Sequence, residues 1–486
     1  MNVCELSPKK VFEYFALLSS VPHGSGNMNP IASLCEDFAK ERGLEYVRDA
    51  ADNIIIKKPG TAGYENAEPV ILQGHLDMVC AKDPDCEKDM ATEPIELYVD
   101  GNYLRARGTS LGGDNIIAVA MIMAILDSDD IAHPPIEAVF TTDEEVGLLG
   151  AAALDFGLLK GKKMINLDSE EEGVFIVCCA GGVRVNAKIP LTFEGVSADS
   201  AAYKITVSGL MGGHSGVDID KGRESANRLI IRFLKRLRER LSFSLCTLEG
   251  GQLDNVICPE SCAVIVIDND PSAVVELNTV VAEFDKIFKN ELAVGDAGVS
   301  VAAESCSLPE RGVVPEDTLR VLTALHVLPY HIQKMSRDFA GLVQTSLNMG
   351  VLKLTDTELK FSYSVRSSVA SEKNDLVNRI IGVLTLAFPG ATVDLHGDYP
   401  SWEYKRDSSL RDVIMTSYKE TTGKDGIVAG THGGLECGIF SESIKGLDCV
   451  SMGPDLAEVH SPRERLDIPS VERLWELMKD ILSRLK

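Results

Sequence analysis

The chain has 486 residues, 45% of them hydrophobic and 25% charged, and a formal net charge of −25 at pH 7. This length is enough for roughly two to four domains, each with its own hydrophobic core. The negative charge argues against nucleic acid or an anionic membrane as the main partner. No stretch reads as a signal peptide or reaches the length of a membrane span, so we expect a cytoplasmic protein.

Two helices are predicted near the N-terminus. Ser7-Pro8 is typical of a capped helix start with a first-turn proline, and apolar residues then recur at helical spacing as far as Leu18. Asn29-Pro30 begins a second helix, which we expect to end at Gly43.

Strands and helices then alternate. Predicted strands cover 53–57, 70–74, 136–141, 164–167 and 174–179, and predicted helices cover 115–126, almost wholly apolar, and 148–156. From about Arg184 the helices become longer and more charged, and the strands alternate polar with apolar residues. After about Pro400 the first pattern returns, with a strand at 447–452 and a helix at 471–485.

This organisation predicts an α/β domain interrupted by an inserted α+β domain. We expect the α/β domain to comprise residues 1–184 and 397–486, with a mixed, mostly parallel sheet flanked by helices. The insertion covers 185–396. Its basic run K-R-L-R-E-R, within 222–240, is interpreted as the solvated face of a helix.

The segment Val70–Asp77 reads V-I-L-Q-G-H-L-D and contains the first candidate functional residues. An apolar run typical of a buried strand is followed by His75 and Asp77, whose side chains point to the same side in extended chain. A carboxylate so placed can accept the second N–H of a metal-binding imidazole and fix its tautomer. A polar pair at a strand end, without metal, is the alternative interpretation.

Further acidic and histidine residues stand at the predicted ends of strands or at a helix start. They are Asp114 in L-G-G-D-N, Glu144 and Glu145 in T-T-D-E-E-V-G, Asp168 after the strand M-I-N-L, and His460 after the strand at 447–452. Each has an ordinary alternative, such as an N-cap aspartate or a solvated acidic turn. Ligand sites in open α/β sheets lie beyond the carboxyl ends of the strands, so we expect these residues to converge.

Two histidines with several carboxylates form a nitrogen and oxygen set suited to zinc, cobalt or manganese. If one carboxylate bridges two such ions, the ions lie about 3.5–4 Å apart, as is usual for paired hydrolytic metals.

Taken together, the motifs resemble the M20 family of dinuclear metallopeptidases. The segments that carry the resemblance are H-L-D, G-G-D-N, T-D-E-E-V-G, N-L-D, a late E-V-H, and G-G-H-S-G at Gly212–Gly216. The stretch G-T-H-G-G-L-E-C-G at Gly430–Gly438 and the large insertion look like the cytosolic aminoacyl-histidine, or carnosine-cleaving, branch of that family. The resemblance covers nearly the whole chain, with the motifs in the expected order.

The resemblance implies a site with two divalent metal ions, zinc first, with cobalt or manganese able to substitute. The implied ligands are His75 and Asp168 for one ion, Glu145 and His460 for the other, and Asp114 as the bridge. It further implies that Asp77 orients His75, and that Glu144 is the general base, taking a proton from water and passing it to the leaving amine.

The resemblance also assigns roles within and beside the insertion. The α/β domain is the implied catalytic domain, and the insertion at 185–396 is its implied lid. His214 is the implied donor to the oxyanion, brought in by closure of this lid. Arg366 and Asn255 are the residues implied to bind the substrate's C-terminal carboxylate. Gly433 and Gly434 are expected to let the backbone approach the substrate. A surface arginine, a turn asparagine and a plain glycine turn are the alternatives.

Many members of the family have a smaller insertion and dimerise through it, so that this histidine comes from the neighbouring chain. Here the insertion is long enough for two similar α+β lobes of ferredoxin-like form, with G-L-M-G-G-H and S-Y-S-V-R-S at corresponding places. In a duplicated lid, His214 acts within its own chain. The oligomeric state, including a homodimer, stays open.

We therefore expect a cytoplasmic, zinc-dependent dipeptidase that hydrolyses small unblocked peptides. The preference for Xaa-His dipeptides such as β-Ala-His rests on the resemblance alone. A tripeptidase, a carboxypeptidase or an N-acyl-amino-acid amidohydrolase of the same fold is the first alternative. An inactive metal-binding scaffold is the second, and Glu144 argues against it because a binder needs no base beside its metals.

Overall fold

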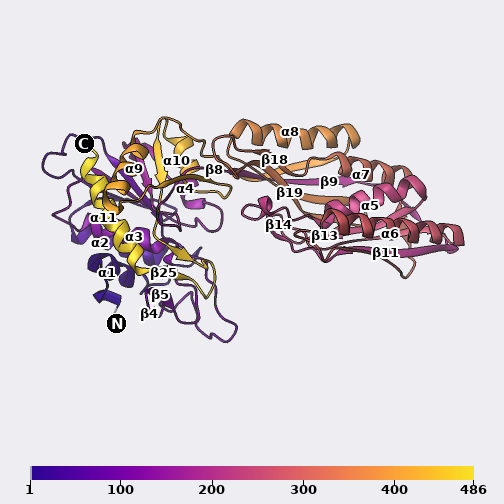
Figure 1. Ribbon diagram of the computed structural model, residues 1–486, viewed down its shortest axis with the longest axis horizontal. Helices are drawn as coiled ribbons and strands as arrows, with labels where there is room; N and C mark the ends of the chain where they lie inside the picture. The colour runs from indigo at the N-terminus through magenta and orange to yellow at the C-terminus, as the bar shows by residue number, and fades with distance from the viewer. Residues whose placement is uncertain (1–2) are drawn as a thin grey trace. The chain divides into compact units, whose positions relative to one another are not determined.

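The chain leaves one structural unit and later returns to it in the computed structural model, which describes residues 3–486 (Figure 1). The first unit contains the chain up to Cys179 together with Trp402–Thr431 and Leu435–Lys486, and the second contains Ala180–Ser401 and His432–Gly434. The changes fall at 179/180 and 401/402, whereas the sequence placed them at 184/185 and 396/397. Strands β9 (Gly181–Pro190) and β21 (Thr392–Tyr399) pair with each other inside the second unit.

The first unit is built on a sheet with the strand order β1-β2-β6-β3-β7-β23-β8-β22. Its strands are β1 (Glu45–Arg48), β2 (Ile54–Lys58), β3 (Val70–His75), β6 (Ile136–Thr141), β7 (Lys163–Asn166), β8 (Val174–Cys179), β22 (Ile427–Thr431) and β23 (Asp448–Ser451). The pairs β6–β3, β3–β7, β7–β23 and β8–β22 are parallel. The pairs β1–β2, β2–β6 and β23–β8 are antiparallel. The sheet is therefore mixed and mostly parallel, as predicted.

Helices of the first unit cover this sheet. They are α1 (Lys9–Leu18), α2 (Asn29–Glu41), α3 (Gly113–Leu126), α4 (Leu149–Ala153), α9 (Ser409–Thr422), α10 (Cys437–Ser443) and α11 (Ile468–Arg484). α3 packs against β3, and every residue from Ile116 to Leu126 is buried, as its continuous apolar sequence predicts. A smaller sheet pairs β4 (Leu97–Asp100), β5 (Tyr103–Ala106), β24 (Leu456–Ala457) and β25 (Arg465–Asp467).

Two predicted helix boundaries are wrong. Ser7 does not cap α1, which begins at Lys9, because its hydroxyl donates to the carboxylate of Glu472, 2.9 Å away in α11. The helix expected at 148–156 ends at Ala153, where the chain turns into a short 3₁₀ helix at Phe156–Leu158. The carboxylate of Asp155 accepts the Gly157 N–H and caps this 3₁₀ turn instead of extending α4.

The second unit contains two lobes that share one sheet. In chain order the first complete lobe is β11 (Ser200–Ser208), α5 (Ala226–Arg240), β13 (Ser244–Gly250), β15 (Ser261–Asp268), α6 (Pro271–Glu291) and β16 (Ser300–Ser305). The other lobe is β9, α7 (Pro315–Val327), β19 (Val343–Leu354), β20 (Glu358–Ser367), α8 (Ala370–Ala387) and β21, with β18 (His331–Met335) paired to β19.

Each lobe has the ferredoxin-like βαββαβ order. The sheet runs β16-β11-β15-β13-β19-β20-β9-β21, so the second strands of the two lobes meet where β13 pairs with β19. The predicted pair of α+β lobes is confirmed. The predicted correspondence of motifs is wrong, because G-L-M-G-G-H follows the first strand of one lobe and S-Y-S-V-R-S forms the third strand of the other.

One lobe is nested inside the other. The chain leaves β9 through β10 (Phe193–Gly195), builds the complete first lobe, and returns through β17 (Arg311–Val313), which pairs with β10. A shared apolar core lies between the sheet and α5 to α8, which pack along it (Figure 1). The lobes therefore fold against one continuous core.

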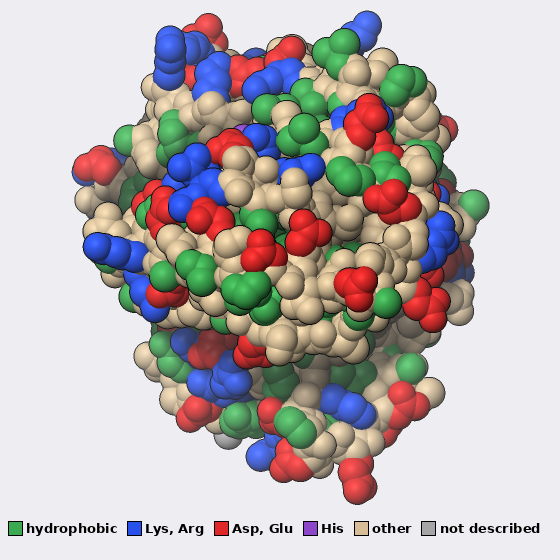
Figure 2. Space-filling model, turned by 90° about the vertical axis from the view of Figure 1, so that its right-hand side faces the viewer, with side chains coloured by type: hydrophobic (Ala, Val, Ile, Leu, Met, Phe, Trp, Pro, Cys, Tyr) green, Lys and Arg blue, Asp and Glu red, His purple; other side chains and the backbone are tan. Residues whose placement is uncertain are grey.

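The basic run of α5 lies on a charged surface, as predicted. Arg232 makes two hydrogen bonds to Glu291, and Arg236 and Arg240 pair with Glu239 and Glu283. Figure 2 shows blue and red side chains interspersed over the face turned to the viewer. Within the part of the chain that the structure describes, no helix has the length and apolar character needed to cross a bilayer.

The buried face of α6 is expected to matter much more for stability than its exposed face. Leu277 is fully buried in the shared core, whereas Val275 on the same helix is 65% exposed. Leu277→Ala should lower the free energy of unfolding by about 2–5 kcal/mol, because it leaves a cavity. Val275→Ala, the matched control, should change it by less than about 0.5 kcal/mol. Urea unfolding measures both, and equal losses would contradict this packing of α6.

Candidate active site

Three neighbouring parallel strands bring the first candidate residues to one edge of the sheet. His75 ends β3 and lies beside Thr141, the last residue of β6, while Gln73 lies beside Asn166, the last residue of β7. Glu144, Glu145 and Asp168 follow within a few residues of these strand ends. The predicted convergence at the carboxyl ends of the strands is therefore present in the first unit.

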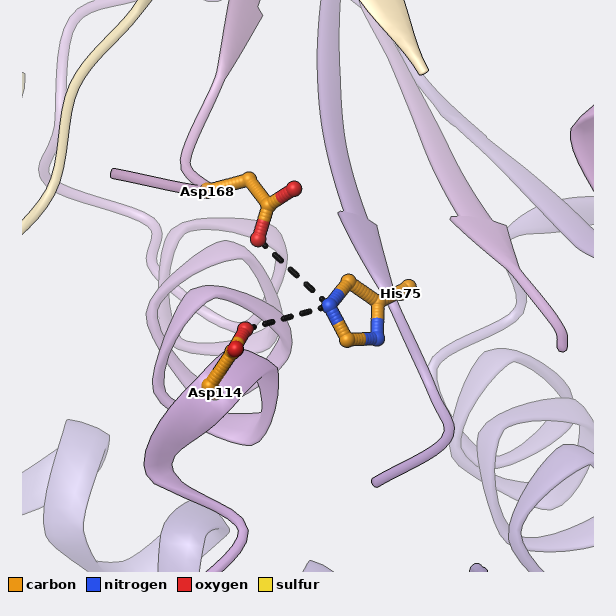
Figure 3. A group of neighbouring side chains, drawn as sticks. All are labelled: His75, Asp114 and Asp168. Atoms are coloured by element: carbon orange, nitrogen blue, oxygen red, sulfur yellow. Dashed lines mark hydrogen bonds and ion pairs between the residues drawn. The ribbon is translucent and has the colours of Figure 1, made fainter. Parts of the chain in front are cut away.

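Asp114 lies between the two histidines. The Nε2 atom of His75 is 3.2 Å from Oδ1 of Asp114 and 3.4 Å from Oδ1 of Asp168 (Figure 3). The Nε2 atom of His460 is 3.2 Å from Oδ2 of Asp114 and 2.8 Å from Oε1 of Glu145. Each carboxylate oxygen of Asp114 thus faces a different histidine, and the two groups of side chains share this one residue.

Asp77 fixes both the first imidazole and the turn that carries the two glutamates. The Nδ1 atom of His75 is 3.0 Å from the Asp77 backbone oxygen and 3.4 Å from its Oδ1. The backbone N–H groups of Glu144 and Glu145 donate to the Asp77 carboxylate at 2.9 and 3.2 Å, and the Ser25 hydroxyl donates at 2.8 Å. With Nδ1 donating to Asp77, Nε2 carries the free lone pair toward the ligand group.

The two adjacent glutamates have different surroundings. Glu145 contacts His460, whereas Glu144 has ligand atoms within 4.8 Å of those of His75 and Glu145. Burial raises the pKa of Glu144 well above its ordinary value, an effect that the nearby charge of His75 opposes. The preceding residue, Asp143, has a φ of +50°, in the left-handed region that few non-glycine residues adopt. The backbone is thus held in a strained conformation where it presents this pair.

The donor set fits divalent cations. Four carboxylates and two imidazoles converge, and their oxygen and nitrogen atoms are the donors that zinc, cobalt or manganese take. Burial raises the pKa of Asp168 to about 6, because the ionised form loses solvation there and lies beside other carboxylates. Cations at this position would compensate the gathered negative charge.

Glu464, in the C-terminal segment, was missed by the sequence analysis. Its carboxylate accepts the N–H groups of Leu111 and Gly112 at 2.8 and 3.1 Å and that of Asp114 at 3.2 Å. It is nearly fully buried and holds the loop that presents Asp114. Glu464 binds backbone N–H groups that precede it by about 350 residues, and backbone groups carry no residue-specific pattern that would reveal this contact in the sequence.

The G-T-H-G-G-L-E-C-G stretch divides between the two units. Glu436 lies in the first unit, where its carboxylate accepts hydrogen bonds from Gln73 at 2.5 Å and Thr141 at 2.7 Å beneath the strand ends. Burial raises its pKa to about 7. His432 lies in the second unit, with Nε2 2.7 Å from the Ser346 hydroxyl. Glu436 therefore links the ends of β3 and β6 through hydrogen bonds.

In the second unit, hydrogen bonds determine the tautomer of His214. The short strands β12 (Gly213–His214) and β14 (Val256–Ile257) pair, and the Ser215 N–H donates to the Asn255 carbonyl at 2.8 Å. The N–H groups of Gly216 and Val217 donate to Nδ1 of His214 at 3.2 and 3.3 Å. With Nδ1 accepting, the neutral ring carries its proton on Nε2. Burial and the charge of Arg366 lower the pKa of His214 and favour this neutral form.

Arg366 lies beside the His214 loop. A Cβ atom added at Gly216 would be 2.9 Å from the His214 ring and 3.3 Å from the Arg366 guanidinium, so both side chains pack against this glycine. A Cβ atom at Gly434 would be 2.7 Å from the ring of Tyr399, so this glycine makes room for an aromatic side chain of the protein. His214, Asn255 and Arg366 therefore lie in one region of the second unit, and Gly434 belongs to it because Arg366 donates a hydrogen bond to Tyr399.

Removing the charge of Glu464 should weaken metal binding. Glu464→Gln places an amide beside three N–H donors, which loosens the Asp114 loop, and we expect the affinity for Zn²⁺ or Mn²⁺ to fall about 10–100-fold. Calorimetric titration measures the affinity. Glu476→Gln is the matched control, because Glu476 is exposed on α11 and pairs only with Lys479 among the described residues. Unchanged affinity in Glu464→Gln would show that the loop holds Asp114 without it.

Comparisons with known proteins agree with this arrangement. Residues 71–484 match the model of Peptidase family M20/M25/M40. The cytosol non-specific dipeptidase of Escherichia coli is 36% identical over 484 residues, covering 100% of this chain and 99% of that protein. The crystal structure of aminoacylhistidine dipeptidase from Vibrio alginolyticus matches with a TM-score of 0.92 at 34% identity, covering 99% and 98% of the two chains. An aminopeptidase PepT from Bacillus cereus shares the fold, with a TM-score of 0.59 at 15% identity and 99% coverage of both chains. The chain belongs to Peptidase family M20/M25/M40.

Proposed function

We propose that this protein is a metal-dependent dipeptidase that hydrolyses unblocked dipeptides. The observation that carries the proposal is the position of Asp114, whose two carboxylate oxygens face His75 and His460 separately. One carboxylate between two ligand groups is the arrangement expected for a pair of hydrolytic metal ions. The names of the Escherichia coli and Vibrio alginolyticus relatives, both dipeptidases, support the substrate class.

The first unit is proposed to be the catalytic domain. His75 and Asp168 would hold one ion, Glu145 and His460 the other, and Asp114 would bridge them. When bound, the two cations would lower the pKa of the attacking water and polarise the scissile carbonyl. We take zinc as the native metal, with cobalt or manganese able to substitute.

Glu144 is proposed as the general base. Its backbone is fixed by Asp77, and its carboxylate belongs to the same ligand-atom cluster as His75 and Glu145. It would accept a proton from the attacking water and then donate it to the amine that leaves when the peptide bond breaks. In this proposal the two adjacent glutamates have separate roles: Glu145 binds metal and Glu144 transfers the proton.

The second unit is proposed to be the lid, which recognises the substrate. His214 carries its proton on Nε2 and would donate it as a hydrogen bond to the oxyanion that forms from the scissile carbonyl. Arg366 and Asn255 would bind the C-terminal carboxylate, with the guanidinium offering two parallel N–H donors. Because the second unit contains two lobes, as expected for a duplicated lid, we propose that this histidine acts in its own chain.

The preference for Xaa-His dipeptides stays a prediction. One relative is named a non-specific dipeptidase and the other an aminoacylhistidine dipeptidase, so the two names differ on the breadth of the substrate range. The cytoplasmic location of this chain also stays a prediction, and its oligomeric state stays open.

Substitution of the two adjacent glutamates should separate catalysis from metal binding. Glu144→Ala should keep the metal content of the wild type and lose about 10²–10⁴-fold in turnover, because the base is gone. Glu145→Ala should lose metal. Elemental analysis after dialysis, together with dipeptide hydrolysis, measures both effects. Metal loss in Glu144→Ala with retention in Glu145→Ala would mean that the two roles are exchanged.

A small substrate panel tests the proposed activity. We expect the zinc-loaded protein to cleave β-Ala-His and Ala-Leu, and to act poorly on a tripeptide or an acetylated amino acid. A higher kcat/KM for β-Ala-His than for Ala-Leu would support the Xaa-His preference. Best activity on the acetylated amino acid or the tripeptide would replace the dipeptidase proposal by an amidohydrolase or tripeptidase. No activity on any of the four after loading with zinc, cobalt or manganese would favour a metal-binding scaffold.

A further inference from the structure

Tyr399 reaches Arg366 across a glycine in the strand between them. β9 lies between β20 and β21, and its residue Gly182 is the cross-strand partner of Arg366 on one side and of Tyr399 on the other. The Tyr399 hydroxyl lies 3.1 Å from Nη1 of Arg366 and accepts its N–H. Three residues in one row across the sheet therefore place a phenol oxygen against the guanidinium.

Two glycines make the space for this aromatic ring. A Cβ atom at Gly182 would lie 2.6 Å from three atoms of the Tyr399 side chain, including the hydroxyl oxygen, and one at Gly434 would lie 2.7 Å from the ring. Backbone or side-chain contacts this short do not occur, so an alanine at either position would displace the ring. Gly182 lies in the segment A-G-G-V at 180–183, where β9 begins.

The backbone at the end of β21, where Tyr399 lies, is also held in place. The Lys373 ammonium donates to the Tyr399 carbonyl at 2.9 Å. A Cβ atom at Gly181 would lie 2.4 Å from the Ser401 backbone nitrogen, so this second glycine allows the two backbones to approach closely. The backbone of Tyr399 is thus fixed, and its ring lies against Gly182 and Gly434.

The hydrogen-bond partner of the Arg366 side chain is a phenol and not a carboxylate. Across residues 3–486 no carboxylate pairs with Arg366, whereas Arg184, two residues from Gly182 on β9, donates to Asp254 at 2.6 Å. A phenol oxygen directs the guanidinium by accepting one N–H but does not neutralise its charge. The full positive charge stays available for an anionic ligand, and the buried Nε atom of Arg366 has no hydrogen-bond partner among the described residues.

We propose that Tyr399 is a positioning residue that orients the Arg366 guanidinium toward the C-terminal carboxylate of the dipeptide. Gly182 and Gly434 have no side chain and so leave space for the Tyr399 ring. This inference rests on the proposed dipeptidase function and on the carboxylate role of Arg366. It adds a residue that acts on substrate affinity and on the choice between a free carboxylate and an uncharged C-terminus.

Tyr399→Phe tests the proposal by removing only the hydroxyl. With a zinc-loaded enzyme, KM for a dipeptide should rise about ten-fold while kcat changes less than about two-fold, because a hydrogen bond to a charged group is lost. The ratio of kcat/KM for the dipeptide to that for its C-terminal amide should fall by the same factor. In an Arg366→Ala background, Tyr399→Phe should have no further effect on KM.

Two control variants separate positioning from a general loss of structure. Tyr203→Phe removes a phenol from β11, far from this row in the sheet order, and should leave KM and the acid-to-amide ratio unchanged. Gly182→Ala should raise KM as Tyr399→Phe does, whereas Gly382→Ala, where no atom lies within 4 Å of the added Cβ, should not. Thermal melting of each variant checks that the fold is retained.

The possible failures are distinguishable. If the wild type cleaves none of the dipeptides, the proposed function is overturned. If dipeptides are cleaved but Arg366→Ala leaves KM unchanged, the carboxylate role of Arg366 is overturned and the inference with it. If Arg366→Ala raises KM while folded Tyr399→Phe keeps the wild-type KM and acid-to-amide ratio, Tyr399 does not position Arg366.

Discussion

Negative charge gathered at one edge of a sheet is the constraint on which the first unit depends. Asp114, Glu144, Glu145 and Asp168 converge there with His75 and His460, although burial disfavours ionised carboxylates. Parallel strands make the convergence possible, because β3, β6 and β7 end side by side. The surrounding protein then supplies oriented hydrogen bonds: Asp77 holds the glutamate turn, and the carboxylate of Glu464 holds the loop of Asp114. Cations that compensate the charge would complete the arrangement.

Sequence patterns predicted the elements of the first unit where local chemistry decides the structure. The apolar runs that form β3 and β6, and the continuously apolar α3, are buried as expected. The pattern was wrong at Ser7, whose hydroxyl is engaged by Glu472 far along the chain, and it gave no signal for Glu464. Both depend on contacts between segments hundreds of residues apart. Residues that stand in recognisable motifs could be selected from the sequence, whereas residues that support those motifs through the backbone could not.

In the second unit, the length of the insertion predicted the number of lobes but not how the chain connects them. Its size predicted two α+β lobes, and both are present, but one is nested between β9 and α7 of the other, so equivalent strands do not follow in tandem order. The two motifs do not correspond because one follows the first strand of its lobe and the other forms the third strand. The tautomer of His214 depends on N–H groups of Gly216 and Val217. The G-G-H-S-G motif therefore supplies both the imidazole and the backbone donors that orient its proton.

The most direct test of a shared carboxylate between two ions is the metal stoichiometry of the wild type and of Asp114→Ala. The protein is stripped with a chelator, loaded with Zn²⁺, freed of unbound metal and analysed for zinc per chain. The account predicts about two equivalents for the wild type and loss of both in the folded variant, because Asp114 belongs both to the group with His75 and Asp168 and to the group with Glu145 and His460. Two equivalents retained by Asp114→Ala, or a wild type that binds none, would contradict it.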